Sequence, residues 1–126
     1  MKNKISTIVF AAVTAMLLLS CGADKNIKKG EKFLAIGEYY EAAEQFKKAY
    51  SKTPPKERDK RGLRAARLAL CYDRMNSHQK AIAAYRNVIR YKQDTPETHL
   101  SIARLLLKDG NYKEAEREFR LVLDTL

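Results

Sequence analysis

Cysteine and histidine are scarce in this chain, with two of each among 126 residues, and tryptophan is absent. Cys21 and Cys71 are too few for a disulfide framework or a cysteine-rich metal site. His78 and His99 are accompanied by no glycine-rich phosphate loop and no nucleophile motif. The sequence therefore carries no catalytic constellation, and we predict a protein that is not an enzyme and uses no cofactor or metal.

The one long apolar run lies at the start of the chain. Lys2 and Lys4 precede an almost continuously apolar stretch over residues 5–19. This stretch is shorter than the roughly 20 residues of a membrane-spanning helix. A positive start followed by a short apolar run is the pattern of a secretory signal. The run ends at Leu18-Leu19-Ser20-Cys21, which resembles the lipobox of bacterial lipoproteins.

This resemblance implies that residues 1–20 are a signal peptide and that Cys21 becomes the lipidated first residue of the mature chain. Residues 21–26 are then the lipidated N-terminus and a short tether. Two or three acyl chains hold firmly, since each buried methylene contributes about 0.8 kcal/mol. Gly22 after the cysteine favours the outer membrane, and the missing acidic run favours a protein that faces the periplasm. The alternatives are an uncleaved anchor and an incidental cysteine.

The charge balance of the chain is strongly basic. Without residues 1–20 the chain has 106 residues, enough for one domain, with 23 basic residues against 15 acidic ones. In an envelope protein this excess favours anionic lipid headgroups, an acidic wall polymer or an acidic protein partner. The alternative is a solvated surface that is merely rich in lysine and arginine. A secretory signal disfavours nucleic acid as a partner.

Three stretches of the chain align with one another: "GEYYEAAEQFKKAY", "NSHQKAIAAYRNVI" and "GNYKEAEREFRLVL". In each stretch a ring is followed three residues later by an alanine and four residues after that by a second ring, which is one face of a helix. The first rings are Tyr39, His78 and Tyr112, the alanines are Ala42, Ala81 and Ala115, and the second rings are Phe46, Tyr85 and Phe119.

Another helical stretch precedes each copy, so the unit is helix, turn, helix. Gly37, Asn76 and Gly110 lie just past the ends of these preceding helices, where a left-handed residue is favoured. Thr95-Pro96 offers a helix start, with an N-cap followed by proline at the first helical position. Thr53-Pro54 offers the same pair and predicts the start of the second unit's first helix.

The units resemble the tetratricopeptide repeat, whose period is 34 residues. The resemblance implies an all-α solenoid of about three helical hairpins over residues 27–126, divided at about 27–56, 62–95 and 96–126. Five extra residues, at 56–60, should lengthen the second unit's first helix by about a turn and a half. The third unit ends without a polar capping helix, which indicates a fragment, a shortened paralogue or a domain covered by a partner.

In this family the first helix of each unit lines a concave groove that binds peptides. The resemblance places these positions at Glu31, Leu34, Leu63, Leu70, Asp73, Arg74, Leu100, Arg104, Leu107 and Lys108. The lysine–asparagine clamp of the chaperone-binding members is missing. A basic stripe of Lys60, Arg64 and Arg67, continued by Arg74, indicates an acidic partner or an anionic wall polymer, or else a solvated helix edge.

Cys71, His78 and His99 each allow two interpretations. Arginines near Cys71 could lower the pKa of its thiol and make it reactive. The favoured interpretation is a small buried apolar residue. His78 and His99 occupy positions where the family has rings, so we predict packing residues in preference to ligands or bases.

The segment "KKGEKFLAIGEYYEAAEQFKKAYSK" is similar to the opening of OmpA-like lipoproteins that carry tetratricopeptide repeats and a β-propeller, some of them in type IX secretion. We therefore expect an outer-membrane-anchored periplasmic scaffold that binds other cell-envelope proteins, with a type IX assembly as one setting. The alternatives are a barrel-assembly lipoprotein, a glycan-binding lipoprotein and a truncated fragment without function. Absent tryptophan and tyrosines at packing positions argue against glycan binding.

Overall fold

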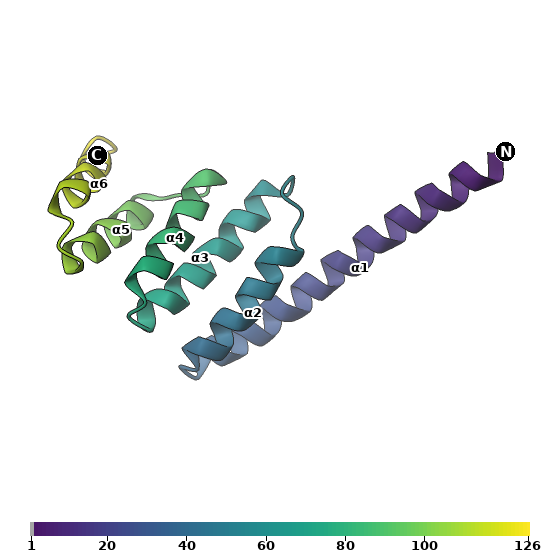
Figure 1. The fold of residues 1–126 in the computed structure, drawn as a ribbon, viewed down its shortest axis with the longest axis horizontal. Coiled ribbons are helices and arrows are strands. Elements are labelled where there is room, and N and C mark those ends of the chain that lie inside the picture. The colour runs from purple at the N-terminus through teal and green to yellow at the C-terminus, as the bar shows by residue number, and fades with distance from the viewer. Residues whose placement is uncertain (1) are drawn as a thin grey trace.

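The structure is a computed structural model that describes residues 2–126, with side chains described for residues 4–14 and 22–126. Its regular elements within residues 2–126 are all α-helices, as the sequence predicts. Consecutive helices form three antiparallel hairpins that stack side by side (Figure 1). The elements are α1 (Lys2–Ala35), α2 (Tyr39–Lys52), α3 (Arg58–Arg74), α4 (His78–Arg90), α5 (Pro96–Lys108) and α6 (Tyr112–Leu123).

The turn inside each hairpin is closed by a residue in the left-handed conformation. Gly37 and Gly110 have φ values of 78° and 76°, and Asn76 has a φ of 57°, which confirms the three predicted helix ends. In each turn the next residue's N–H donates to the carbonyl five residues earlier, at 2.9, 2.9 and 2.8 Å. Lys92 ends α4 in the same left-handed conformation, with a φ of 55°. Lysine is not a typical residue for this conformation, so this helix end was not predicted from the sequence.

The predicted start of α3 at Thr53-Pro54 is wrong. Thr53 is the residue that ends α2, and its hydroxyl donates to the carbonyl of Ala49 at 2.6 Å. A turn follows, in which the Glu57 N–H donates to the Pro54 carbonyl at 3.0 Å, and α3 begins at Arg58. The helix is still extended, with 17 residues against 13 in α5, so part of the insertion lengthens it as predicted.

The core lies along the contacts between neighbouring helices and is built from the repeated small and large residues. Ala42, Ala81 and Ala115 are completely buried. Gly30 allows α1 to approach α2, because a β-carbon at this position would lie 2.8 Å from the ring of Phe46. One predicted packing ring is misplaced: Tyr112 is 69% exposed, because it is the first residue of α6 and no further helix covers it within the described chain.

The predicted tether over residues 21–26 differs from the structure, in which these residues belong to α1. Ala23 and Asn26 are buried against α2, and the Asn26 amide is bonded to Gln45 at 2.8 Å and to Lys52 at 2.9 Å. The face that packs on α2 therefore continues one turn further towards the N-terminus than the sequence indicates. The side chain of Cys21 lies outside the described residues.

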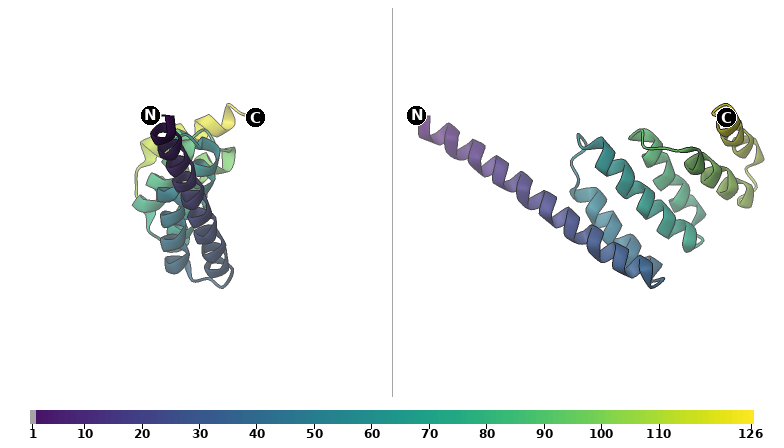
Figure 2. Two further views of the ribbon diagram at one scale, coloured as in Figure 1. Left: turned by 90° about the vertical axis from the view of Figure 1, so that its right-hand side faces the viewer. Right: turned by 180° about the vertical axis from the view of Figure 1, so that it is seen from behind.

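The N-terminal part of α1 projects away from the repeats (Figures 1 and 2). Side chains 4–13 are exposed, including Ile8 at 68% and Phe10 at 72%. Within residues 2–126 no helix combines the length and the apolar character needed to cross a membrane.

Candidate functional site

In the view of Figure 1, α2 lies in front of α1 and α4 lies in front of α3. Seen from behind, α1 passes in front of α2, the reverse of the order in Figure 1 (Figure 2). The first helices α1, α3 and α5 carry two neighbouring grooves. The first groove, of about 530 Å³, lies between α1 and α3, and the second, of about 390 Å³, lies between α3 and α5.

The two grooves meet at Leu70, which lines both. Ile27, Leu63 and Ala66 give the first groove an apolar floor, and Leu63 is 59% exposed there. The second groove is more polar. The first groove is lined by Asp24, Ile27, Glu31, Lys60, Leu63, Arg64, Ala66, Arg67 and Leu70, and the second by Leu70, Asp73, Arg74, Tyr85, Ser101 and Arg104.

The basic stripe of the first groove is neutralised by acids of the same chain. Arg64 bonds to Asp24 of α1 at 3.1 Å, and Arg67 bonds to Glu31 of α1 at 2.8 Å. The Arg64 side chain is only 11% exposed and also donates to the Thr53 hydroxyl, so it is not a residue of a solvated edge. These two arginines hold α1 to α3.

Ion pairing also extends along the rest of the two grooves. Lys60 lies 3.5 Å from Glu57, the residue that directly precedes α3. In the second groove Arg104 of α5 pairs with Asp73 of α3, and this hydrogen bond raises the pKa of Arg104. Arg74 is the one groove-lining cation that pairs with no carboxylate among the described side chains. The grooves thus offer apolar surface and one unpaired positive charge.

Most of the predicted concave residues line these grooves. Leu34 does not, since it packs against the core cluster around Phe46 and Cys71. Lys108 is exposed and lines neither groove, and Leu100 and Leu107 are each 42% exposed outside both. The predicted residues that do line a groove are Glu31, Leu63, Leu70, Asp73, Arg74 and Arg104, together with the stripe residues Lys60, Arg64 and Arg67.

Five groove residues were not predicted from the sequence: Asp24, Ile27, Ala66, Tyr85 and Ser101. Asp24 and Ile27 precede Glu31 by seven and four positions, which places all three on one side of α1. This spacing was available as a signal, but it was obscured by the assignment of residues 21–26 to a tether. Tyr85 of α4 and Ser101 of α5 had no signal, because they reach the second groove from positions that the family pattern does not assign to it.

The two histidines form polar contacts between helices. His78 Nδ1 lies 2.8 Å from Asp109. His99 lies between two carboxylates, with Nδ1 2.8 Å from Glu118 and Nε2 2.9 Å from Asp94. Burial lowers the pKa of His99, but the bonds to Glu118 and Asp94 outweigh it and raise that pKa above its ordinary value. His99 therefore forms ion pairs at the contact between α5 and α6, which the predicted packing role did not include.

Cys71 lies in the core and is completely buried. Burial, reinforced by Glu31 and opposed by Arg67, raises the pKa of its thiol to about 11. This supports the interpretation of Cys71 as a buried apolar residue. The described side chains include no cluster of three histidine, cysteine or carboxylate residues that could hold a metal ion.

Comparisons with solved structures give the fold. The tetratricopeptide domain of Arabidopsis FLU superposes with a TM-score of 0.76 at 18% identity, over 85% of this chain and 96% of that one. The second tetratricopeptide domain of Spaghetti (RPAP3), bound to the HSP90 peptide SRMEEVD, gives a TM-score of 0.71 at 18% identity over 87% and 96%. MamA of Desulfovibrio magneticus RS-1 gives 0.66 at 18% identity over 93% and 70%.

Sequence comparisons point the same way. Residues 65–95 match the model of the tetratricopeptide repeat. DnaJ homolog subfamily C member 3 of Homo sapiens is 31% identical over 107 residues, which are 82% of this chain and 20% of that protein. The chain thus spans about a fifth of the length of the curated relatives it matches. Its architecture is a tetratricopeptide-repeat solenoid, a fold suited to protein–protein interaction.

Proposed function

We propose that this protein is a lipid-anchored adaptor that uses its two joined grooves to bind segments of other cell-envelope proteins. One observation carries the proposal: an exposed apolar floor lies along α1 and α3 in the first groove, and Leu70 joins this floor to the more polar second groove. Exposed apolar surface in a concave site is the usual mark of a binding site.

The chemistry of the grooves defines the class of ligand. Because Arg64 and Arg67 are already paired, a polyanionic ligand would have to displace Asp24 and Glu31. An apolar segment would instead bury Ile27 and Leu63, at about 25 cal/mol per Å² removed from water. Arg74 could then receive a single carboxylate of the same segment. The ligand is therefore an apolar peptide segment with at most a few acidic residues.

Three further observations support the ligand and the setting. The lipobox-like sequence at Cys21 supports a covalent lipid, the outer membrane and a location in the periplasm. The RPAP3 neighbour binds a peptide, which supports a peptide as the ligand of this chain as well. The similarity to OmpA-like lipoproteins supports a type IX secretion or gliding assembly as the source of the partner. A barrel-assembly complex is the competing source.

The test is a cross-linked pull-down from membranes, read by mass spectrometry, with the full chain. Leu63→Glu places a charge in the first groove and should abolish partner recovery. Leu123→Glu is the matched control, because Leu123 is exposed to a similar extent, 64% against 59%, but lies outside both grooves. Equal loss in the two variants, or no loss in Leu63→Glu, would contradict groove binding. Recovery of barrel-assembly proteins would replace the type IX setting.

A Cys21→Ala variant tests the anchor separately. It should leave the protein unlipidated and reduce the recovery of membrane partners without changing the fold. Mass spectrometry of the purified wild-type protein should find a chain that starts at a lipidated Cys21. An unmodified cysteine in the mature protein would contradict the anchor while leaving the groove proposal open to its own test.

A further inference from the structure

The two edges of the solenoid differ in charge. The α2–α3 and α4–α5 connections lie along one edge, and the three hairpin turns lie along the opposite one (Figure 1). We call residues 52–61 and 90–95 the loop edge, and residues 35–39, 74–78 and 108–112 the turn edge. The loop edge has seven basic residues against three acidic ones, whereas the turn edge has two of each.

The positive charge of the loop edge is mostly not compensated within the protein. Glu57 is paired with Lys60 at 3.5 Å, and Asp94 is bonded to His99 at 2.9 Å. Among the described side chains, the other basic residues of this edge form no ion pair; these are Lys52, Lys56, Arg58, Arg61, Arg90 and Lys92. Of the acids there, only Asp59 remains without an ion pair, so the edge keeps a net positive surface.

Stacking between arginine and tyrosine joins the two connections of the loop edge into one surface. The Arg61 guanidinium lies 4.4 Å from the ring centre of Tyr50 and 5.5 Å from that of Tyr91. Arg58 lies 5.7 Å from the ring centre of Tyr91 and donates to the carbonyl of Arg90 at 3.0 Å. The basic groups of the α2–α3 and α4–α5 connections are thereby held in a fixed arrangement.

The same edge contains the start of the proposed mature chain. A β-carbon placed on Gly22 would lie 3.5 Å from Lys52 Nζ, so the residue after Cys21 is next to the end of α2. Asp24 is joined through Arg64 to Thr53, the residue that ends α2. A lipid on Cys21 would therefore enter the bilayer from the side of the molecule that carries the loop edge.

We propose that the loop edge rests on anionic lipid headgroups and that this contact fixes the orientation of the solenoid on its membrane. The proposal builds on the lipid anchor of the proposed function. A basic residue near an anionic membrane contributes a free energy that corresponds to about a fivefold change in the equilibrium. Several such residues, held rigidly beside an anchor, favour one orientation over free rotation about the lipid.

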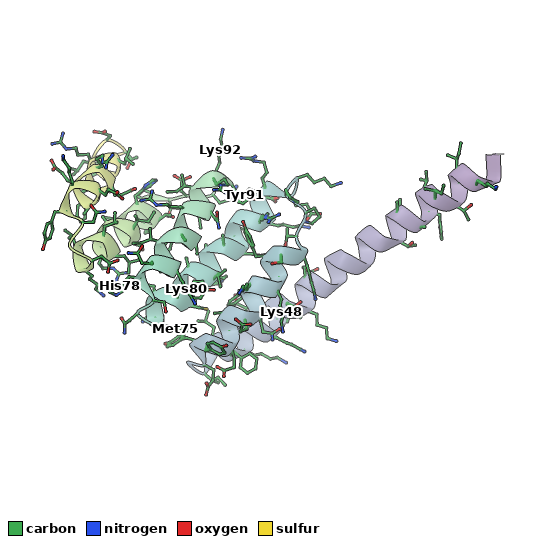
Figure 3. The ribbon with its side chains drawn as sticks, in the orientation of Figure 1. Lys48, Met75, His78, Lys80, Tyr91 and Lys92 are labelled. Carbon is green, nitrogen blue, oxygen red and sulfur yellow. The ribbon has the colours of Figure 1, made fainter. Side chains whose placement is uncertain are left out.

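Helix α4 offers a pair of positions for the test, because exposed Lys80 lies near its start and exposed Lys92 lies two residues beyond its end. Figure 3 shows Lys92 at the loop edge and Lys80 near the opposite end of α4. Lys92→Cys and Lys80→Cys remove the same charge and allow a fluorophore to be attached at either end. Cys71 is completely buried, and the proposed lipid occupies Cys21, so each variant is labelled at the introduced thiol.

The full chain, purified with its lipid, is incorporated into vesicles that contain a headgroup-linked quencher. With phosphatidylglycerol present, the label at position 92 should be quenched strongly and the label at position 80 weakly. The difference should disappear in purely phosphatidylcholine vesicles and at 1 M salt, where the Debye length falls to about 3 Å. Neutralising Lys56, Arg58 and Arg90 together with glutamine should weaken the oriented state about a hundredfold.

The outcomes separate the two proposals. A chain that does not float with vesicles contradicts the anchor. A chain that floats but shows equal quenching at positions 92 and 80 overturns the headgroup contact and leaves the anchor intact. Stronger quenching at position 92 that persists in phosphatidylcholine also overturns it, since the orientation would then not depend on anionic lipid. Neutralising Lys32 and Lys113, which lie away from the loop edge, should leave the quenching unchanged.

Discussion

Replacing Gly30 with alanine should destabilise the first repeat, although alanine is the better helix former. In a helix interior, alanine is favoured over glycine by about 1 kcal/mol. Against this, the new β-carbon would lie 2.8 to 3.0 Å from three ring atoms of Phe46. Phe46 is completely buried, so its ring cannot move aside without displacing the core. Overpacking of this kind costs about 1–3 kcal/mol, so the expected net effect is a loss of up to about 2 kcal/mol.

Gly22→Ala is the matched control in the same helix. Its β-carbon would lie 3.5 Å from Lys52 Nζ, which is an ordinary contact. This variant should be unchanged or more stable by up to about 1 kcal/mol. Urea and thermal unfolding followed by circular dichroism will rank the variants by stability. A difference of about 1 kcal/mol corresponds to about 4–8 °C in Tm.

The contact between Gly30 and Phe46 allows a second test. Phe46→Leu removes ring atoms that the new methyl group would meet, so it should cost less stability in the Gly30→Ala background than in the wild type. Gly30→Ala that equals or exceeds Gly22→Ala in stability would refute the argument, since it would mean that α1 does not approach α2 as closely as the structure places it.

Three further results are expected. The raised pKa of His99 means that its stabilising contribution is complete below pH 6.5 and is lost as the pH rises through the folded-state pKa. His99→Gln should remove this dependence of the unfolding free energy on pH. An NMR titration midpoint of His99 at or below 6.5 would contradict the prediction. Cys71, with a thiol pKa of about 11, should react with a disulfide reagent at pH 8 only after unfolding, and equal rates in the folded and unfolded chains would refute its burial. Arg64→Met should destabilise the folded chain more than Asp24→Asn, because the Arg64 side chain is 11% exposed and that of Asp24 is 65% exposed. Exposed ion-pair partners contribute about 0–1 kcal/mol. The reverse order of the two variants in urea unfolding would show that the pair does not hold α1 to α3.

The fold was predictable because its signals are local. Repeated spacing of rings and alanines marks the helix faces, and Gly37, Asn76 and Gly110 mark the turns by a conformation that few residues adopt. The start of α3 was not predictable in the same way. Thr53-Pro54 and Thr95-Pro96 read alike, yet the Thr53 hydroxyl donates back to α2 and accepts a hydrogen bond from Arg64, eleven residues later.

The candidate site was predictable only in outline. Family spacing selected Glu31, Leu70 and Arg104, which line the two grooves. It could not show that the basic stripe is neutralised, because Asp24 and Arg64 are forty residues apart and meet only through the packing of α1, α2 and α3. The signal-peptide pattern also suggested that the repeats begin after residue 26, whereas α1 already packs on α2 before that residue.

Helix α1 has a mechanical consequence. It forms one wall of the first groove and continues without a break to residue 21. At 1.5 Å per residue, Glu31 lies about 15 Å along the axis from Cys21. With a lipid on Cys21, no flexible linker would separate the membrane from the groove that binds the partner. The protein would then be a rigid spacer of fixed length, and a force applied to the partner would tilt the whole solenoid relative to the bilayer.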